Sequence, residues 1–199
     1  DYSWKALIII FCLLCFYEFY NLINKIYKNI IFKTILFFFI VLYLYFFYSL
    51  LIRLRIEFGE EVILILLISC IFSDIGGYVV GKLIGGPKLT SISPNKTISG
   101  ALGSIIFTVI GTSSFALFLN KVDEGLIKLE FSFIIFIWLI IMSIFCQFGD
   151  LIVSYLKRKA NVKDTGNLLP GHGGILDRVD GIIFAIPFGV LAFLILGPI

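Results

Sequence analysis

The sequence is poor in charged residues, and this scarcity excludes most classes of soluble protein. Asp, Glu, Lys and Arg make up 15% of the 199 residues, whereas a typical soluble domain has about 25%. Hydrophobic residues reach 60%, and the mean hydropathy is +1.07. These values exclude an ordinary globular domain and a disordered chain. The net charge of +3 is too small to indicate nucleic-acid binding, and we expect no nucleic-acid partner.

Histidine and cysteine are scarce as well. His172 is the only histidine, and no Cys/His cluster accompanies it, so a zinc site of that kind is not predicted. The four cysteines, Cys12, Cys15, Cys70 and Cys146, all lie inside apolar runs. We interpret them as small apolar side chains of membrane helices and expect no disulfides.

Six long apolar runs make up most of the sequence. The hydrocarbon core of a bilayer needs roughly 20 apolar residues in a helix, and a β-barrel would need short alternating segments instead. The runs predict an all-α, polytopic integral membrane protein with about six transmembrane helices in one domain, residues 1–199. Residue 1 is Asp, so we expect the chain to be truncated at its start. The predicted spans are 4–23, 31–52, 61–84, 100–119, 131–156 and 181–199.

The basic residues predict the orientation of the spans. Five of the 16 Lys and Arg residues lie on one side: Lys5, Arg53, Arg55, Lys121 and Lys128. Eleven lie in the first, third and fifth connections: Lys25, Lys28, Lys33, Lys82, Lys88, Lys96, Lys157, Arg158, Lys159, Lys163 and Arg178. The side with eleven is predicted to be cytoplasmic, in the cytoplasmic membrane. The polar, glycine-rich connections 82–99 and 157–180 then face the same compartment and predict one cytoplasmic site.

Three carboxylates lie within the predicted spans. Asp74 precedes Lys82 by eight residues, and Asp150 precedes Lys157 by seven. At about 1.5 Å per residue these offsets correspond to ~12 and ~10 Å, so both carboxylates should lie at similar depth. Their burial in a membrane is costly, and it indicates either a polar cavity or a pair of interhelical hydrogen-bonding residues. Glu18 lies near the end of its span, and we expect it to snorkel to the interface.

The segment from Ser154 to Asp180 combines groups suited to phosphate and metal chemistry. Its fixed cations suit phosphates, and its glycines let backbone approach a ligand. A helix that begins near Ile175 would present its N-terminal amides to an anion. Carboxylates among phosphate-binding cations indicate Mg²⁺, for which Asp150, Asp177 and Asp180 are the candidate ligands; a second cation is compatible with the site. The candidate cations are Lys157, Arg158, Lys163 and Arg178.

His172 leaves two roles open. It could act as an acid, a base or a phosphate donor, or it could only stabilise the turn Pro170-Gly-His-Gly-Gly174. A solvated charged loop is the alternative for the whole segment.

This segment resembles the signature of the phosphatidate cytidylyltransferases, also called CDP-diacylglycerol synthases. That pattern reads Ser, any, apolar, Lys-Arg, four residues, Lys-Asp, then a small residue, and ends in His-Gly-Gly-apolar-any-Asp-Arg-apolar-Asp. It matches from Ser154 to Asp180 and includes Asp164 after Lys163. The runs Asp74–Gly85 and Ser91–Gly100 are similar to two other elements of the family, although Asn95 and Ser99 depart from the latter.

The resemblance implies that CTP and phosphatidate react to give CDP-diacylglycerol and pyrophosphate. It implies catalytic roles in the signature, Mg²⁺ as cofactor, membrane lipid as surroundings, and a homodimer as a reasonable assembly. The implied catalytic residues are Asp150, Lys157, Arg158, Lys163, Asp164, His172, Asp177, Arg178 and Asp180. The implied substrate-binding residues are Asp74, Ser93, Lys96, Thr97, Gly173 and Gly174.

Three other functions remain open at this point. A polyprenol or phytol kinase would share the apolar spans, metal carboxylates and phosphate-binding loops. A transporter could use Asp74 and Asp150 as ion sites, but we find no corresponding pair of broken spans. A non-catalytic assembly subunit would not need the complete signature.

Overall fold

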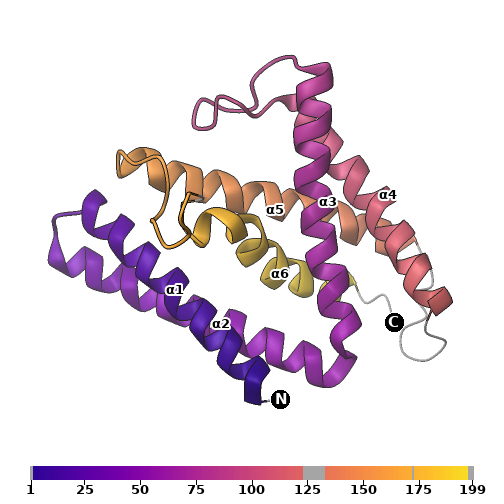
Figure 1. The fold of residues 1–199 in the computed structure, drawn as a ribbon, viewed down its shortest axis with the longest axis horizontal. Coiled ribbons are helices and arrows are strands. Elements are labelled where there is room, and N and C mark those ends of the chain that lie inside the picture. The colour runs from indigo at the N-terminus through magenta and orange to yellow at the C-terminus, as the bar shows by residue number, and fades with distance from the viewer. Residues whose placement is uncertain (1, 123–132, 172, 197–199) are drawn as a thin grey trace.

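Six long helices form the part of the chain that the structure describes. The structure is a computed structural model, and it describes residues 2–122, 133–171 and 173–196. All six helices are long and apolar enough to cross a membrane, so the predicted class is confirmed. The helices, labelled in Figure 1, are α1 (Tyr2–Ile26), α2 (Ile30–Phe58), α3 (Glu60–Ile84), α4 (Ile98–Val122), α5 (Phe133–Lys159) and α6 (Leu176–Leu196).

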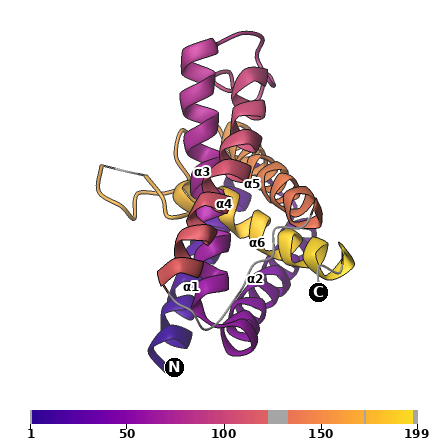
Figure 2. The ribbon, with the colours of Figure 1, turned by 90° about the vertical axis from the view of Figure 1, so that its right-hand side faces the viewer.

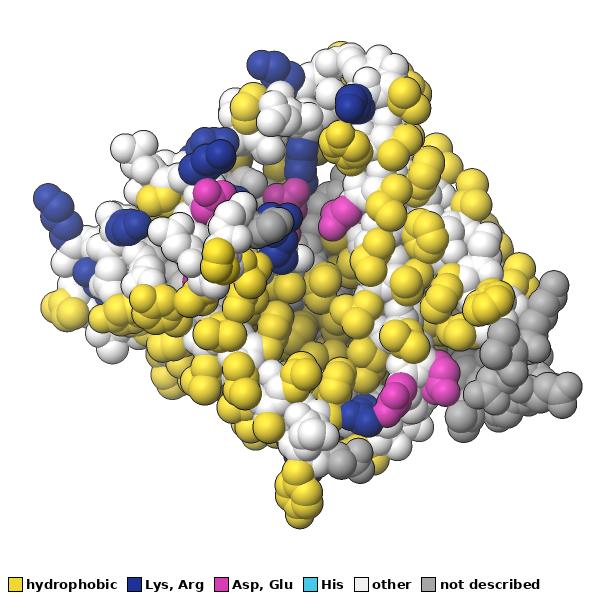
Figure 3. All heavy atoms as spheres, in the orientation of Figure 1, with side chains coloured by type: hydrophobic (Ala, Val, Ile, Leu, Met, Phe, Trp, Pro, Cys, Tyr) yellow, Lys and Arg dark blue, Asp and Glu magenta, His cyan; other side chains and the backbone are white. Residues whose placement is uncertain are grey.

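The outer surface of the helices is suited to lipid. Phe38 and Phe39 on α2 are 61% and 60% exposed, and many other large apolar side chains share this exposure. Figure 3 shows a broad apolar surface, with charged side chains gathered around a hollow near one end. Such a surface would be unfavourable in water, because each exposed square ångström of apolar area costs about 25 cal/mol. The protein is therefore an integral membrane protein.

The helices associate mainly as consecutive pairs. The pairs α3 with α4 and α5 with α6 have the most extensive contacts, and α1 packs on α2. Glycines let α3 and α4 approach closely: a Cβ added to Gly76 would collide with Phe107 and with the carbonyl oxygen of Gly103. Small residues at such crossings let membrane helices pack backbone to backbone.

Local signals set the ends of several helices. The side chain of Asn29 accepts hydrogen bonds from the N–H groups of Ile31 (2.9 Å) and Phe32 (3.3 Å), and so caps the start of α2. Gly59, with φ of 85°, makes the tight turn from α2 to α3. Gly85 ends α3 in the left-handed region, with φ of 63°.

Pro187 interrupts the hydrogen-bond ladder of α6. Proline has no N–H, so the carbonyl four residues earlier, at Ile183, loses its helical donor. The hydroxyl of Tyr43 on α2 donates to that carbonyl at 2.7 Å. Two residues beyond the proline, the indole N–H of Trp138 donates to the carbonyl of Gly189, also at 2.7 Å. Neighbouring helices therefore satisfy the backbone around the proline, as hydrocarbon surroundings require.

The three connections that carry most basic residues lie on one side. Nζ of Lys159, at the end of α5, donates to the hydroxyl of Tyr27 in the connection between α1 and α2, at 3.0 Å. Lys96, in the connection between α3 and α4, forms an ion pair with Asp150 near the end of α5. Figure 2 shows the connection between α5 and α6 projecting from the helices. These contacts link the α1–α2 connection to the end of α5, and the α3–α4 connection to Asp150 on the same helix.

Candidate functional site

A carboxylate in the first turn of α6 holds the α5–α6 loop (residues 160–175) in place. Asp177 accepts hydrogen bonds at Oδ2 from the N–H groups of Thr165 (2.8 Å) and Gly174 (3.0 Å), and the hydroxyl oxygen of Thr165 lies 3.0 Å from the same atom. Its Oδ1 accepts a hydrogen bond from Nζ of Lys157 at 2.7 Å. Asp177 therefore fastens the loop to both helices that flank it.

A second carboxylate, from α1, reaches the same junction. Glu18 is fully buried, with 0% exposure. Its Oε1 accepts from the N–H of Ile175 at 2.9 Å, and its Oε2 accepts from the N–H of Leu176 at 2.8 Å and from the Thr165 hydroxyl at 2.6 Å. The expectation that Glu18 snorkels to the interface is wrong, because the first amides of α6 lack helical partners and supply donors.

This contact changes the interpretation of the α6 N-terminus. Its amides were predicted to face an anion, and the anion is a side chain of the protein itself. The helix begins at Leu176, in agreement with the predicted start near Ile175, and so extends ahead of the predicted span 181–199. The polar residues at 177, 178 and 180 belong to its first turns and do not precede it.

Three further carboxylates gather at the crossing of α3, α5 and α6. Asp150 and Asp180 lie within hydrogen-bonding range of each other, and the charge of Asp74 acts on both. Asp150 also forms the ion pair with Lys96, and its Oδ1 accepts a hydrogen bond from the hydroxyl of Ser154 at 3.2 Å. The structure therefore brings Asp74 and Asp150 together, in agreement with their predicted common depth.

A glycine allows the approach of Asp150 to Asp180. Gly149 is buried where α5 crosses α6, and a Cβ there would collide with the carbonyl oxygen of Asp180 and lie 2.9 Å from the ring of Phe184. Any side chain at this position would push the two helices apart. The approach of Asp150 to Asp180 therefore requires that Gly149, which precedes Asp150, has no side chain.

The three predicted magnesium ligands do not form a single set. Asp150 and Asp180 lie together, whereas both oxygens of Asp177 are used by Lys157 and the loop. Within residues 2–122, 133–171 and 173–196, no group of three His, Cys, Asp or Glu side chains is arranged to hold a metal ion. Mg²⁺ that binds together with phosphate oxygens usually takes only one or two carboxylates from the protein. The Asp150–Asp180 pair fits that kind of site.

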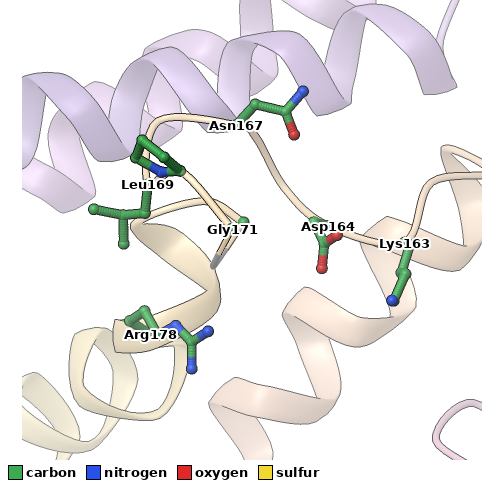
Figure 4. Close-up of a pocket in the computed structure, with 8 residues that line it drawn as sticks. Lys163, Asp164, Asn167, Leu169, Gly171 and Arg178 are labelled. Carbon is green, nitrogen blue, oxygen red and sulfur yellow. The ribbon is translucent and has the colours of Figure 1, made fainter.

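A pocket of about 480 Å³ opens between the α5–α6 loop and the start of α6 (Figure 4). Lys163 and Arg178 reach it from different elements, and Gly171 and Gly173, with φ of 75° and 84°, shape the turn beside it. Two cations and exposed backbone suit a phosphate-bearing ligand. The lining residues are Lys163, Asp164, Asn167, Leu169, Pro170, Gly171, Gly173 and Arg178.

The α3–α4 loop (residues 85–97) carries the other predicted substrate-binding residues. The N–H of Lys96 donates to the carbonyl of Ser93 at 3.1 Å, which closes a turn. Oγ1 of Thr97 accepts from the N–H of Gly100 at 3.0 Å and caps α4. Thr97 is thus occupied at a helix end, and Lys96 is the residue of this loop that reaches the carboxylates.

The remaining predicted residues are spread over the site. Arg158 is exposed at the end of α5, and Gly174 is buried within the α5–α6 loop. His172 lies outside the residues that the structure describes.

Sequence reasoning missed the contact between Glu18 and Thr165. The only signals for it were a glutamate in an apolar run and a threonine inside the Ser154–Asp180 segment.

Comparison with known proteins gives a consistent result. Residues 2–196 match the model of the Cytidylyltransferase family. A phosphatidate cytidylyltransferase of Helicobacter pylori (strain J99) is 44% identical over 130 residues, which cover 64% of this chain and 45% of the relative. One of Bacillus subtilis (strain 168) is 39% identical over 142 residues, covering 71% of this chain and 50% of the relative. The chain spans about half the length of the curated relatives that it matches.

Proposed function

Since the chain belongs to the cytidylyltransferase family, we propose that it transfers the cytidylyl group of CTP to phosphatidate, giving CDP-diacylglycerol and pyrophosphate. One observation carries this proposal: Asp180 of the Asp150–Asp180 pair and Arg178 of the cationic pocket lie two residues apart at the start of α6. A carboxylate pair beside phosphate-binding cations suits a reaction between two phosphate-bearing substrates.

The reaction requires the protein to align the two substrates and to neutralise the negative charge of their phosphates. The phosphate of phosphatidate attacks the α-phosphorus of CTP, and the bond to the pyrophosphate leaving group breaks. The nucleophile is already an anion, so no strong general base is required. Orienting the two substrates in line can supply much of the acceleration. Lys163 and Arg178, which line the pocket, are placed to hold nucleotide phosphates.

We further propose Mg²⁺ as the cofactor, held by Asp150 and Asp180. When bound, it would supply a Lewis acid that neutralises phosphate charge. The fit rests on the donor set: two carboxylates within hydrogen-bonding range of one another, beside which Lys96 already provides a positive charge. Asp177 has a different task, because its oxygens hold Lys157 and the loop.

The site is proposed to face the cytoplasm, in the cytoplasmic membrane. Its support is the excess of Lys and Arg in the three connections that the structure brings to one side. CTP would then enter from the cytoplasm, and phosphatidate would enter from the inner leaflet. A homodimer remains a proposal that follows from the family alone.

Two labelled forms of CTP test the reaction. The purified protein is supplied with phosphatidate in detergent and with CTP that carries ³²P at either the α- or the γ-position. We expect label from the α-position to enter the lipid and label from the γ-position to leave as pyrophosphate. A polyprenol or phytol kinase would instead place γ-label on a lipid alcohol. Absence of α-label from the lipid would refute the proposed reaction.

A further inference from the structure

We propose that Glu18, on α1, is a positioning residue: it sets the start of α6 and thereby holds Asp180 beside Asp150. This inference rests on the proposed function, because it assigns the two aspartates to the reacting site. Glu18 precedes the signature by more than a hundred residues and lies in an apolar run. It does not touch the pocket or the carboxylate pair, so its effect would pass through the helix that it caps.

The contacts of Glu18 fix the backbone directly. Its two oxygens accept hydrogen bonds from the successive N–H groups of Ile175 and Leu176, at 2.9 and 2.8 Å. These amides are the first of α6 and have no partner within the helix. A fully buried carboxylate with 0% exposure holds them in one orientation, because two buried N–H groups without an acceptor would be unfavourable in this interior.

A hydroxyl connects this carboxylate to a second one. Oγ1 of Thr165 lies 2.6 Å from Oε2 of Glu18 and 3.0 Å from Oδ2 of Asp177. Asp177 in turn accepts from Nζ of Lys157 on α5. Glu18, Thr165 and Asp177 therefore form a chain of contacts from α1 through the loop to α6, and Lys157 continues it to α5.

The loop is shaped around the Glu18 side chain. A Cβ at Gly166 would lie 2.8 Å from Oε1 of Glu18, and a Cβ at Gly174 would collide with both Glu18 and Thr165. Neither glycine has a positive φ, so the backbone conformation alone does not require glycine there. Two glycines of the signature thus make room for a carboxylate from a distant helix.

The effect on the reacting site follows from helix geometry. Asp180 lies one turn beyond Asp177 on the same helix, so a shift or rotation of the first turn of α6 moves Asp180 relative to Asp150. A displacement of about 1 Å at a reacting group can lower a rate about 100-fold. Loss of Glu18 should therefore lower turnover without removing any group that contacts the substrates.

Three variants of α1 test the proposal in purified, folded protein. Glu18→Ala removes both acceptors, and Glu18→Gln retains one acceptor in the same shape. Cys15→Ala is the matched control, because Cys15 is also 0% exposed on α1 but makes none of the contacts to the loop. We expect kcat to fall about 100-fold in Glu18→Ala and by a smaller factor in Glu18→Gln. Cys15→Ala should stay within about threefold, since no loop contact changes.

Two measurements separate positioning from a general loss of stability. Hydrogen exchange at the amides of 175 and 176 should accelerate in both Glu18 variants and not in Cys15→Ala. Thr165→Val combined with Glu18→Gln should lower kcat by less than the product of the two single effects, because both act on the same junction.

Each outcome decides a separate question. The positioning role is overturned if folded Glu18→Gln has normal kcat and normal amide protection, whether or not Glu18→Ala folds. It is also overturned if Cys15→Ala lowers kcat as much as the Glu18 variants do. If wild-type protein places no cytidylyl label on lipid, the proposed reaction fails, and the exchange data still show whether Glu18 holds the start of α6.

Discussion

The α5–α6 loop is anchored from within the protein, whereas the α3–α4 loop is held mainly at its ends. The first has two buried or half-buried carboxylates beneath it, Glu18 and Asp177, which contact six hydrogen-bond donors between them. The second has the bridge between Lys88 and Thr97 and the ion pair of Lys96 with Asp150.

The difference predicts different roles for the two loops in the proposed reaction. A loop fixed by buried carboxylates is preorganised, so it loses little freedom when the substrate binds. Lys96 is different, because its ion pair is partly exposed to solvent, at 25% for Lys96 and 31% for Asp150. Exposed pairs contribute little stability, so Lys96 can exchange its carboxylate for a phosphate at small cost.

The largest effect is expected at the Asp150–Asp180 pair, which Lys96 of the α3–α4 loop contacts and which lies one turn beyond the anchor Asp177. Asp180→Asn should lower turnover at least about 1,000-fold, because one of the two carboxylates proposed to hold Mg²⁺ is lost. Turnover is measured with α-labelled CTP, and folding is checked by size-exclusion chromatography in detergent. Near-normal product formation would remove Asp180 from the site.

The anchored loop should be sensitive to a single methyl group. Gly174→Ala places a Cβ against Thr165 and Glu18, and overpacking of this kind costs about 1–3 kcal/mol. We expect a lower midpoint of thermal unfolding and lower turnover. Gly85→Ala in the α3–α4 loop is the comparison: nothing lies within 4 Å of its Cβ, so only its positive φ opposes the change. Equal loss of turnover in both variants would contradict the distinction between the loops.

A smaller and more selective effect is expected at Lys96. Lys96→Ala should raise KM for CTP about tenfold, since one charge-assisted contact to phosphate is removed. Thermal stability should change by less than about 1 kcal/mol, because the pair with Asp150 is partly exposed. Lys96→Arg serves as the control that retains the charge. A large loss of stability with unchanged KM would make Lys96 a structural residue.

The smallest effect is expected at Ser99. Its hydroxyl contacts the carbonyl of Gly85 and the hydroxyl of Thr97, all within the α3–α4 junction. Ser99→Ala should cost about 0.5–1.5 kcal/mol of stability and leave turnover within about twofold, because the junction makes no contact with the carboxylate pair. A tenfold loss of turnover would show that this junction is as tightly coupled to the reaction as the other loop.

Much of the fold was predictable from hydropathy, because a bilayer imposes the length of each span. The common depth of Asp74 and Asp150 was also predictable, since both offsets are counted along helices from a basic end. The partner of Glu18 was not, because the contact joins residues 147 positions apart and depends on how α1 crosses the loop. The separation of Asp177 from Asp150 and Asp180 was missed for a similar reason: helical spacing places Asp177 and Asp180 on one face but does not reveal which donors lie nearby.

The hydroxyl of Tyr43 donates to the carbonyl of Ile183, which Pro187 leaves without a helical donor, so the first two helices also support α6. A shortened protein that kept only α3 to α6 would retain the signature residues. It would, however, lack the Tyr43 hydroxyl that pairs with the carbonyl of Ile183, and it would lack Glu18, which accepts from the N–H of Ile175. The helices α1 and α2 therefore help to hold α6 in place. Any minimal enzyme engineered from this scaffold has to include them.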